Sequence, residues 1–185
     1  MADDPHLDRL LDDLSGRLAH QEREEMLAVS EDLARAERAQ LTLADRLRAS
    51  LDRPVVLQLS ESLRLSGRVE EVSSSWMTLR EDGAGRASLV PLTAIVLLEG
   101  LSARARPLEE SALAPRGLGA MLRGMARDRA TVRVETRSGG ITGRIADVGA
   151  ELIDVVSLPT GERSSVPGSS RLSVVLSSIL AVRPR

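Results

Sequence analysis

The sequence predicts an α+β protein in which a long N-terminal helix precedes two tandem small β-barrels, each five-stranded and each introduced by a short helix. Two observations predict this fold class. An apolar stripe with helical spacing runs through roughly the first fifty residues, and the strand pattern that follows it returns later in the chain. Internal repetition of this kind indicates a duplicated supersecondary unit. The expected parts are an acidic helical or coiled-coil extension (1–42), a first helix-plus-barrel unit (43–101), a linker (102–116) and a second helix-plus-barrel unit (117–185).

The repeat is visible in identical or similar residues as well as in the predicted strand pattern. The Gly-Arg-Val of residues 67–69 recurs 76 positions later as the Gly-Arg-Ile of residues 143–145. A glycine inside a short strand is typical of a sheet that bends sharply, because it has no Cβ to clash. Both copies are therefore expected to contain a bent second strand.

The short helices belong to the repeat. "LADRLRASLDRPVVLQL" aligns with "LGAMLRGMARDRATVRV", which places Arg53 on Arg129. Strands are expected after Pro54, with a hairpin turn at Asp82-Gly83, and again from Thr131. In the second copy the last hairpin loop, residues 159–170, is expected to be the longer one.

Residues 6 to about 51 have the spacing of an amphipathic helix, in which Val29, Leu33 and Ala36 resume a stripe begun by leucines at 7, 11, 14 and 18. That length favours a coiled coil or a bent helical hairpin. The stripe fits a helix packed along the barrels as well as it fits one that dimerises or docks on a partner. Both interpretations stay open from the sequence.

Composition narrows the classes of function. Net charge is −2, so no global basic field attracts nucleic acid. Cysteine is absent, which excludes disulfides and thiolate metal sites. Lysine is absent too, and an arginine-only set of cations indicates the codon bias of a high-GC bacterium. No signal peptide and no membrane-spanning apolar run are visible, so a soluble cytoplasmic protein without a membrane partner is expected.

Chemistry-bearing residues do not form a recognisable catalytic pattern. No nucleophile stands in the context of a base, and the histidines at 6 and 20 have no second ligand beside them. The sequence therefore predicts that the protein is not an enzyme and holds no cofactor or metal. Trp76, the only aromatic residue, takes a strand position matched by Leu152 and is expected in the core.

One short helix followed by five short strands resembles the Sm-like small barrel of Sm proteins and the bacterial RNA chaperone Hfq. The resemblance covers residues 43–100 and 117–183, and other SH3-like barrels share the pattern. The whole chain is also similar to small proteins of high-GC bacteria labelled Fis-like transcription regulators. Fis proteins end in a helix-turn-helix, whereas this chain ends in predicted strands.

The Sm-like resemblance implies a ring whose inner loops hold single-stranded, often uridine-rich RNA. Ser73 and Met77 occupy the places of the family's Asp and Asn, and Gly149 and Ile153 do so in the second copy. An apolar side chain cannot read a base edge, and the aromatic residues on which bases stack are missing there. RNA binding would then depend on arginine and on backbone groups.

Arginine is concentrated in the middle of the chain. Residues 101–148 contain nine arginines and five acidic residues, a net charge of +4. Such a stripe could follow a phosphate backbone and would make binding strongly salt-dependent. The same arginines also fit an ordinary solvated surface. The candidate nucleic-acid-binding residues, at matching places in the repeat, are Arg46, Arg48, Arg53, Arg123, Arg127 and Arg129.

The predicted function is that of a non-enzymatic regulatory protein that binds RNA, with DNA as the second choice. A homo-oligomer (a dimer or higher) or a protein partner is expected through the N-terminal helix. The alternative is an interaction scaffold that binds no nucleic acid and dimerises or docks through that helix. Residues 1–40 contain eleven acidic residues and five arginines, a net charge of −6, which suits a docking arm better than a nucleic-acid contact.

Overall fold

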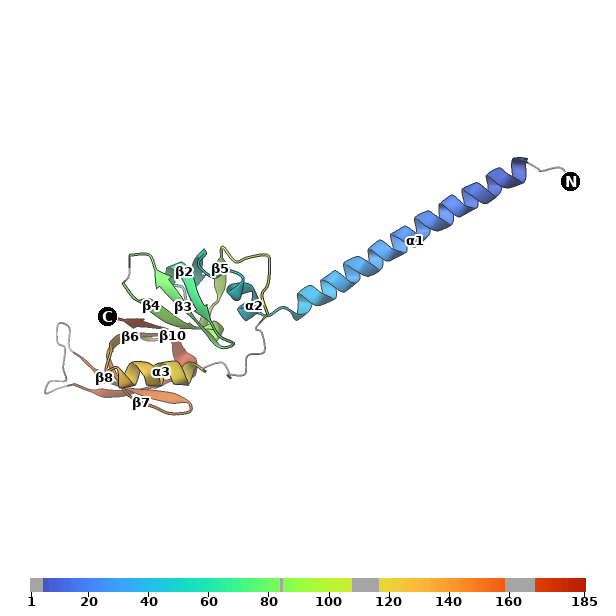
Figure 1. The fold of residues 1–185 in the computed structure, drawn as a ribbon. Helices are drawn as coiled ribbons and strands as arrows, with labels where there is room; N and C mark the ends of the chain where they lie inside the picture. The colour runs from blue at the N-terminus through green and yellow to red at the C-terminus, as the bar shows by residue number, and fades with distance from the viewer. Residues whose placement is uncertain (1–4, 84, 108–116, 159–168) are drawn as a thin grey trace. The chain divides into compact units, whose positions relative to one another are not determined.

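A computed structural model describes residues 5–83, 85–107, 117–158 and 169–185, with side chains of the N-terminal helix given for residue 20 and from residue 23 onwards. The chain divides into two compact units, Met1–Leu41 and Thr42–Arg185. The first unit contains α1 (Pro5–Gln40). The second contains all ten strands (Figure 1).

The second unit contains the same series of elements twice. The first half comprises α2 (Leu43–Arg48), β1 (Pro54–Gln58), β2 (Arg64–Val72), β3 (Trp76–Glu81), β4 (Ala87–Pro91), a 3-10 turn (Leu92–Ala94) and β5 (Leu97–Glu99). The second half comprises α3 (Leu118–Arg127), β6 (Thr131–Thr136), β7 (Gly139–Val148), β8 (Leu152–Ser157), β9 (Arg171–Val175), a 3-10 turn (Leu176–Ser178) and β10 (Ile179–Pro184).

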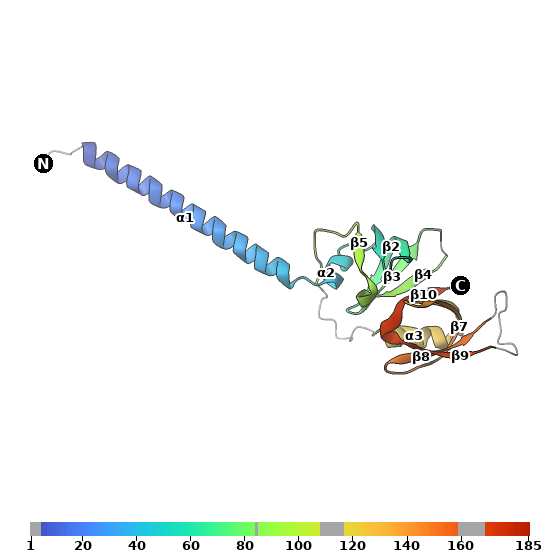
Figure 2. The same ribbon diagram turned by 180° about the vertical axis from the view of Figure 1, so that it is seen from behind.

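The ten strands form one antiparallel sheet in the order β5-β1-β2-β3-β4-β10-β6-β7-β8-β9. Each half has its fifth strand beside its first, and the halves meet where β4 pairs with β10. Figure 2 shows the first half in green and the second in orange to red, with α2 and α3 each beside its own half. The edges of the whole sheet are therefore β5 and β9.

This continuous sheet corrects the fold class predicted from the sequence. Two tandem five-stranded barrels were expected, yet the ten strands form a single sheet, whose halves meet at the contact between β4 and β10, here called the internal joint. At the joint the Arg183 guanidinium donates two hydrogen bonds to the Glu81 carboxylate, at 2.9 and 2.6 Å. The two strands pair where Val182 lies opposite Leu89, and this contact covers two strand edges that would otherwise face water. Pairing between strands so distant in the chain leaves no local pattern in the sequence.

The expected N-terminal helix is corrected as well. The sequence predicts one helix from residue 6 to about 51, but α1 ends at Gln40 and a new helix begins at Leu43. The structure does not show the single long helix that was predicted. Within α1, a continuous run of side chains is described only for residues 23–40. The break is caused by Thr42, whose hydroxyl caps α2 and whose own backbone is extended.

The repeated glycine has the same physical cause in both halves. A Cβ on Gly67 would meet the carbonyl oxygen of Arg80, and a Cβ on Gly143 would meet that of Val156. The ladders of β2 with β3 and of β7 with β8 also shift register at matching places, after Val69 and after Ile145. A close backbone approach followed by a bulge bends a sheet. The prediction of a bent second strand agrees with this geometry.

Two apolar clusters form the core, and each receives residues from the other half. Leu47 of α2 lies in the first cluster, which also takes in Leu180 and Ala181 of β10. Leu122 of α3 lies in the second, which includes Trp76 and Leu89 from the first half. Trp76 is buried as predicted, but it packs against the second half and not into its own.

Two predictions fall partly on residues outside the described ranges. These are most of the linker 102–116 and most of the long hairpin loop 159–170. The hairpin turn at Asp82-Gly83 is described as far as Gly83, whose φ of 77° is the left-handed conformation that glycine accommodates.

Candidate nucleic-acid interface

α2 is held tightly by its own side chains. The hydroxyl of Thr42 accepts a hydrogen bond from the backbone N–H of Asp45, while the Asp45 carboxylate accepts one from the backbone N–H of Thr42 at 2.9 Å. The Thr42 hydroxyl donates to the same carboxylate at 2.6 Å. The hydrogen bond from the Thr42 hydroxyl, then the one from the Thr42 backbone N–H, and then Arg48 hold the pKa of the Asp45 carboxyl below its usual value. α2 therefore begins with a complete capping box.

Arg46 and Arg48, both candidate binding residues, are occupied within the fold. Arg48 donates to the Asp45 carboxylate at 2.6 Å, and its side chain is only 10% exposed. Arg46 donates from Nε to the backbone carbonyl of Ser102 at 3.1 Å. Ser50 completes the contact, because its hydroxyl accepts from the Ser102 N–H at 2.9 Å. Arg46 therefore fastens α2 to the segment after β5, whereas Arg48 is neutralised by a carboxylate of α2 itself.

α3 differs from α2 at the corresponding places. Its N-cap is Gly117, which has no side chain to cap the helix, and the helix itself contains no acidic residue. Its apolar face packs on β7 and buries Leu122. Asp128, at the C-cap, is the nearest carboxylate in sequence. α3 therefore leaves its arginines without an acidic partner on the helix.

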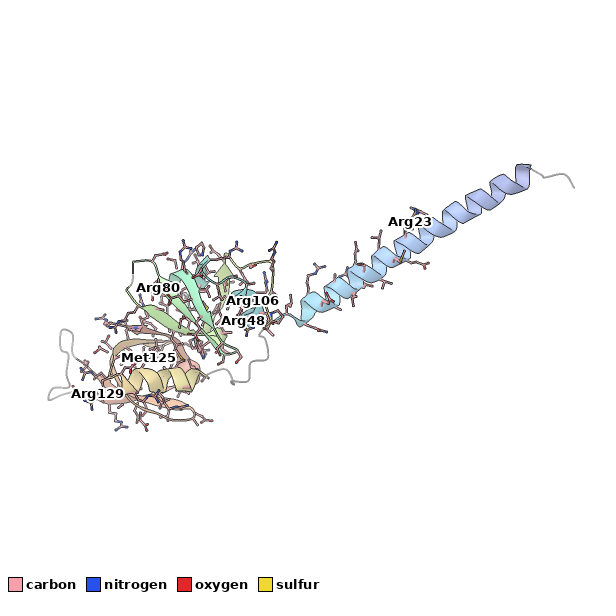
Figure 3. All side chains as sticks on the ribbon, viewed as in Figure 1. Arg23, Arg48, Arg80, Arg106, Met125 and Arg129 are labelled. Atoms are coloured by element: carbon pink, nitrogen blue, oxygen red, sulfur yellow. The ribbon has the colours of Figure 1, made fainter. Side chains whose placement is uncertain are left out.

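Arg123, Arg127 and Arg129 are all exposed. Within the described part of the chain, none of the three side chains forms an ion pair or hydrogen bond. Arg123 and Arg127 are four residues apart, so they lie on one side of the helix. Figure 3 labels Arg129, which follows the C-terminal end of α3. Three of the six candidate arginines are thus exposed on α3 or just after it, with no ionic partner among the described residues.

A shallow hollow runs along the same side of α3. Its volume is about 470 Å³, and its lining includes Ala120, Gly124, both helical arginines and the carboxylate residue Asp128. Arg123 lies back over Gly119, with Nη1 3.4 Å from the place where a Cβ would stand. Small residues between two guanidinium groups let another chain approach the helix backbone closely. The surface formed by Arg123, Arg127 and Arg129 with this hollow is called the α3 surface below.

Arg53 is exposed, but it does not match Arg129 as the sequence alignment predicts. Strand pairing sets Val55 opposite Gly67 and Val132 opposite Gly143, so Arg53 corresponds to Ala130. The backbone conformation supports the same correspondence, because Asp52 and Arg129 both have a left-handed conformation, with φ of 58° and 49°. The predicted alignment is wrong by one residue here, because the gap after the helix is two residues long.

Other kinds of site are not visible in the described ranges. No three His, Cys, Asp or Glu side chains gather there as a metal site would require. No helix in the described residues combines the length and apolar character needed to cross a membrane. Comparison with known proteins adds no assignment: no protein-family model, no curated protein and no solved structure matches the chain.

Sequence reasoning missed one group of exposed residues. Val96 and Leu97 at β5, and Leu172 and Val175 on β9, are 40–67% exposed although they read as strand core. Only the strand order shows that β5 and β9 are the edges of the sheet. The signal available in the sequence was the absence of charge at Val96 and Leu97, where edge strands usually place lysine or proline.

Proposed function

We propose that this protein is a non-enzymatic, cytoplasmic regulator that binds the phosphate backbone of nucleic acid, RNA ahead of DNA, through the α3 surface. The observation that supports the proposal is the exposure of Arg123, Arg127 and Arg129 without an ionic partner among the described residues. Guanidinium groups bind phosphate oxygens with two parallel hydrogen bonds. Arg46 and Arg48 are not part of the proposed surface, because both are engaged within the fold.

The form of binding follows from the side chains. The α3 surface presents three arginines beside one acidic residue, Asp128, and the only aromatic residue, Trp76, is buried. No aromatic side chain is available there for base stacking, and we expect contacts from the guanidinium groups to phosphate and sugar to dominate. Binding should be weak, sequence-tolerant and strongly salt-dependent.

The test is titration of labelled single- and double-stranded RNA and DNA oligonucleotides at two salt concentrations. The variant R123Q/R127Q/R129N removes the three charges, and Asn suits the left-handed backbone at position 129. We expect it to lower affinity about tenfold or more and to reduce the slope of log K against log salt by about 2.

The matched control is R23Q/R35Q/R38Q on α1, which removes the same number of charges from exposed positions. It should bind like the unmodified protein. Equal losses in both variants would mean that net charge alone attracts the oligonucleotide. Failure of the unmodified protein to bind any oligonucleotide at low salt would contradict the proposal.

A second candidate function is supported by α1. Met26, Val29 and Leu33 are 65%, 68% and 61% exposed, and their spacing of three and four residues is that of a coiled-coil seam. We propose that, in this alternative, two copies of α1 associate and the protein acts as a dimeric scaffold. The acidic character of residues 1–40 should make this association stronger at high salt, which is the opposite of nucleic-acid binding.

Molar mass in solution tests the scaffold alternative. V29E/L33E should produce monomers if the seam holds the dimer together. L27E is the control, because Leu27 is also exposed (64%) but lies off the seam. A mass unchanged by V29E/L33E would eliminate α1 as the dimerising element.

A further inference from the structure

A hollow lies at one end of the internal joint, beside the first residues of β4 and the last residues of β10. Its volume is about 340 Å³. Three of its described lining residues are arginines, Arg86, Arg183 and Arg185, and Glu81 is the one carboxylate side chain among them. Figures 1 and 2 both show the C-terminus beside β4 and β10. The hollow is called the joint pocket below.

The pairing of the two strands explains why these arginines meet. The antiparallel register of the joint, continued to the ends of β4 and β10, places Arg183 opposite Ser88 and Arg185 opposite Arg86. Alternate residues of a strand point to the same face of a sheet. Both pairs therefore lie on one face, and all four residues line the joint pocket.

The carboxylates near the joint are already paired with other arginines. Glu81 accepts two hydrogen bonds from Arg183, at 2.9 and 2.6 Å, and a further one from the Ser88 hydroxyl. Glu135 lies 3.7 Å from Arg183 and pairs with Arg133 at 2.6 Å. Both carboxylates are only 11% exposed. Neither is therefore available to the other two arginines of the pocket.

Arg86 and Arg185 have no carboxylate partner of this kind. Both are exposed, and within the described ranges neither side chain forms an ion pair or a hydrogen bond. Like charges that lie directly opposite each other on paired strands repel and weaken the pairing. The joint thus ends in two guanidinium groups whose mutual repulsion a bound anion would relieve.

We infer that the joint pocket binds a dianionic phosphate group, either free phosphate or the end of a small phosphomonoester. Such a group carries a charge of about −1.5 to −2 at neutral pH, which matches the two guanidinium groups of Arg86 and Arg185. Each guanidinium group can bind phosphate oxygens with two parallel hydrogen bonds. A phosphodiester carries a single charge and balances only half of theirs. Bound phosphate therefore bridges β4 and β10 and stabilises the joint.

Thermal melting tests the bridge. The variant R86Q/R185Q removes the two facing charges and leaves the pair of Arg183 with Glu81 in place. In low-salt buffer without polyvalent anions it should melt at or slightly above the Tm of the unmodified protein, because the repulsion is gone. With phosphate about a hundredfold above Kd, the Tm of the unmodified protein should rise by about 5 °C or more and pass that of the variant. Sodium chloride of equal ionic strength should not reverse the order.

Titration calorimetry identifies the form of phosphate. Inorganic phosphate and glycerol phosphate are compared with dimethyl phosphate, a singly charged diester, which should bind much more weakly. R86Q and R185Q should each lower the affinity for the dianions about tenfold. R104Q/R106Q is the control, since both arginines are exposed and lie after β5, outside the pocket. Adding Gly-Ser after Arg185 moves the terminal carboxylate away and should maintain or raise the affinity.

The same titration separates this site from the proposed nucleic-acid surface. R123Q/R127Q/R129N should bind phosphate like the unmodified protein, whether or not the α3 surface binds nucleic acid. An equal rise in Tm for the unmodified protein and R86Q/R185Q would overturn the inference, as would the absence of binding by either dianion at low salt. Loss of RNA binding in R86Q/R185Q without any binding of the dianions would also contradict it, because the pocket would then be a further contact for nucleic acid.

Discussion

The two halves of the sheet unit share a backbone design and differ in the chemistry of their surfaces. Both have a helix, a glycine at a close backbone approach, a bulge at the same place and the strand order 5-1-2-3-4. In the first half, Arg48 pairs with Asp45, and Arg46 donates a hydrogen bond to the carbonyl of Ser102. In the second half Arg123 and Arg127 remain exposed.

This difference shows where function can reside in a duplicated protein. The shared features are those that the bent sheet needs, since altering them would break both copies alike. The features that differ are the helix caps, the ion pairs and the cover of the edge strands. We therefore expect substitutions at shared positions to affect folding and substitutions at differing positions to affect binding or assembly.

The largest effect should come from the shared glycines. Gly67→Ala and Gly143→Ala each place a methyl group against a backbone carbonyl that a paired strand holds in position. Each should lower the free energy of unfolding by about 4 kcal/mol or more. Because the two core clusters exchange residues across the joint, both variants should melt the whole sheet unit.

Denaturant unfolding followed by circular dichroism measures this effect. Gly85→Ala is the control, since no atom lies within 4 Å of the added Cβ. Retention of one folded half in either variant would show that the halves are independent, contrary to a joint that unites them.

The next largest effect is a difference in stability between substitutions at two equivalent repeat positions, Trp76 and Leu152. Trp76→Ala removes a buried ring from the joint and should cost about 3–5 kcal/mol. Leu152→Ala acts at the same repeat position, but its side chain is 42% exposed, so it should change stability by about 0.5 kcal/mol or less in the monomer. Chemical denaturation at low protein concentration tests the contrast, and similar costs at both positions would refute it.

A smaller effect concerns the cap that only α2 possesses. Asp45→Asn removes the charge from the capping box and from the pair with Arg48, and should cost about 1 kcal/mol. The folded state lowers the pKa of Asp45, so ionised Asp45 stabilises the fold above the ordinary carboxyl pKa. This stability is lost as the pH falls through the lowered pKa of the folded state.

Melting curves of the unmodified protein and Asp45→Asn across the acid range measure that contribution. The difference between the two proteins should shrink as the pH falls. A constant difference would mean that the charge of Asp45 is unimportant and that only its hydrogen bonds matter.

The smallest effect should be a gain, in α3. Gly124→Ala places a methyl group where no atom lies within 4 Å, in a helix interior where glycine is unfavourable. Stability should rise by about 0.5–1 kcal/mol. Calorimetric melting should show a small rise in Tm, and the same substitution at Gly67 should lower Tm strongly, which is the matched contrast.

Local patterns predicted much of the second unit correctly. The alternation around residues 55–59 and 131–136 marks β1 and β6, and Asp82-Gly83 marks a turn. The glycines at 67 and 143 indicated bends, because only glycine fits where a paired backbone comes so close. These features depend on neighbours in sequence or on one paired strand, so they can be read from short windows.

The candidate arginines could be found from the sequence but not ranked. Arg48 and Arg123 align in the repeat. Each has a small residue four positions earlier, Ala44 before Arg48 and Gly119 before Arg123, so this position does not distinguish them. Asp45, three residues before Arg48, was a visible local signal for an ion pair on α2. The contact of Arg46 with the Ser102 carbonyl, 56 residues away, had no such signal.

The sequence by itself determined the duplication, the succession of a helix and five strands along each copy, and the glycines that let each sheet bend, because these depend on residue types at fixed spacing. Only the tertiary structure decided that the two copies share one sheet, that Trp76 serves the opposite half, and which arginines remain available. The physical reason is that strands pair at their edges through backbone N–H and C=O groups, which nearly every residue has. The residue types in an edge strand therefore do not indicate which strand it pairs with. Burial then depends on which edge is covered, which is a property of the whole sheet.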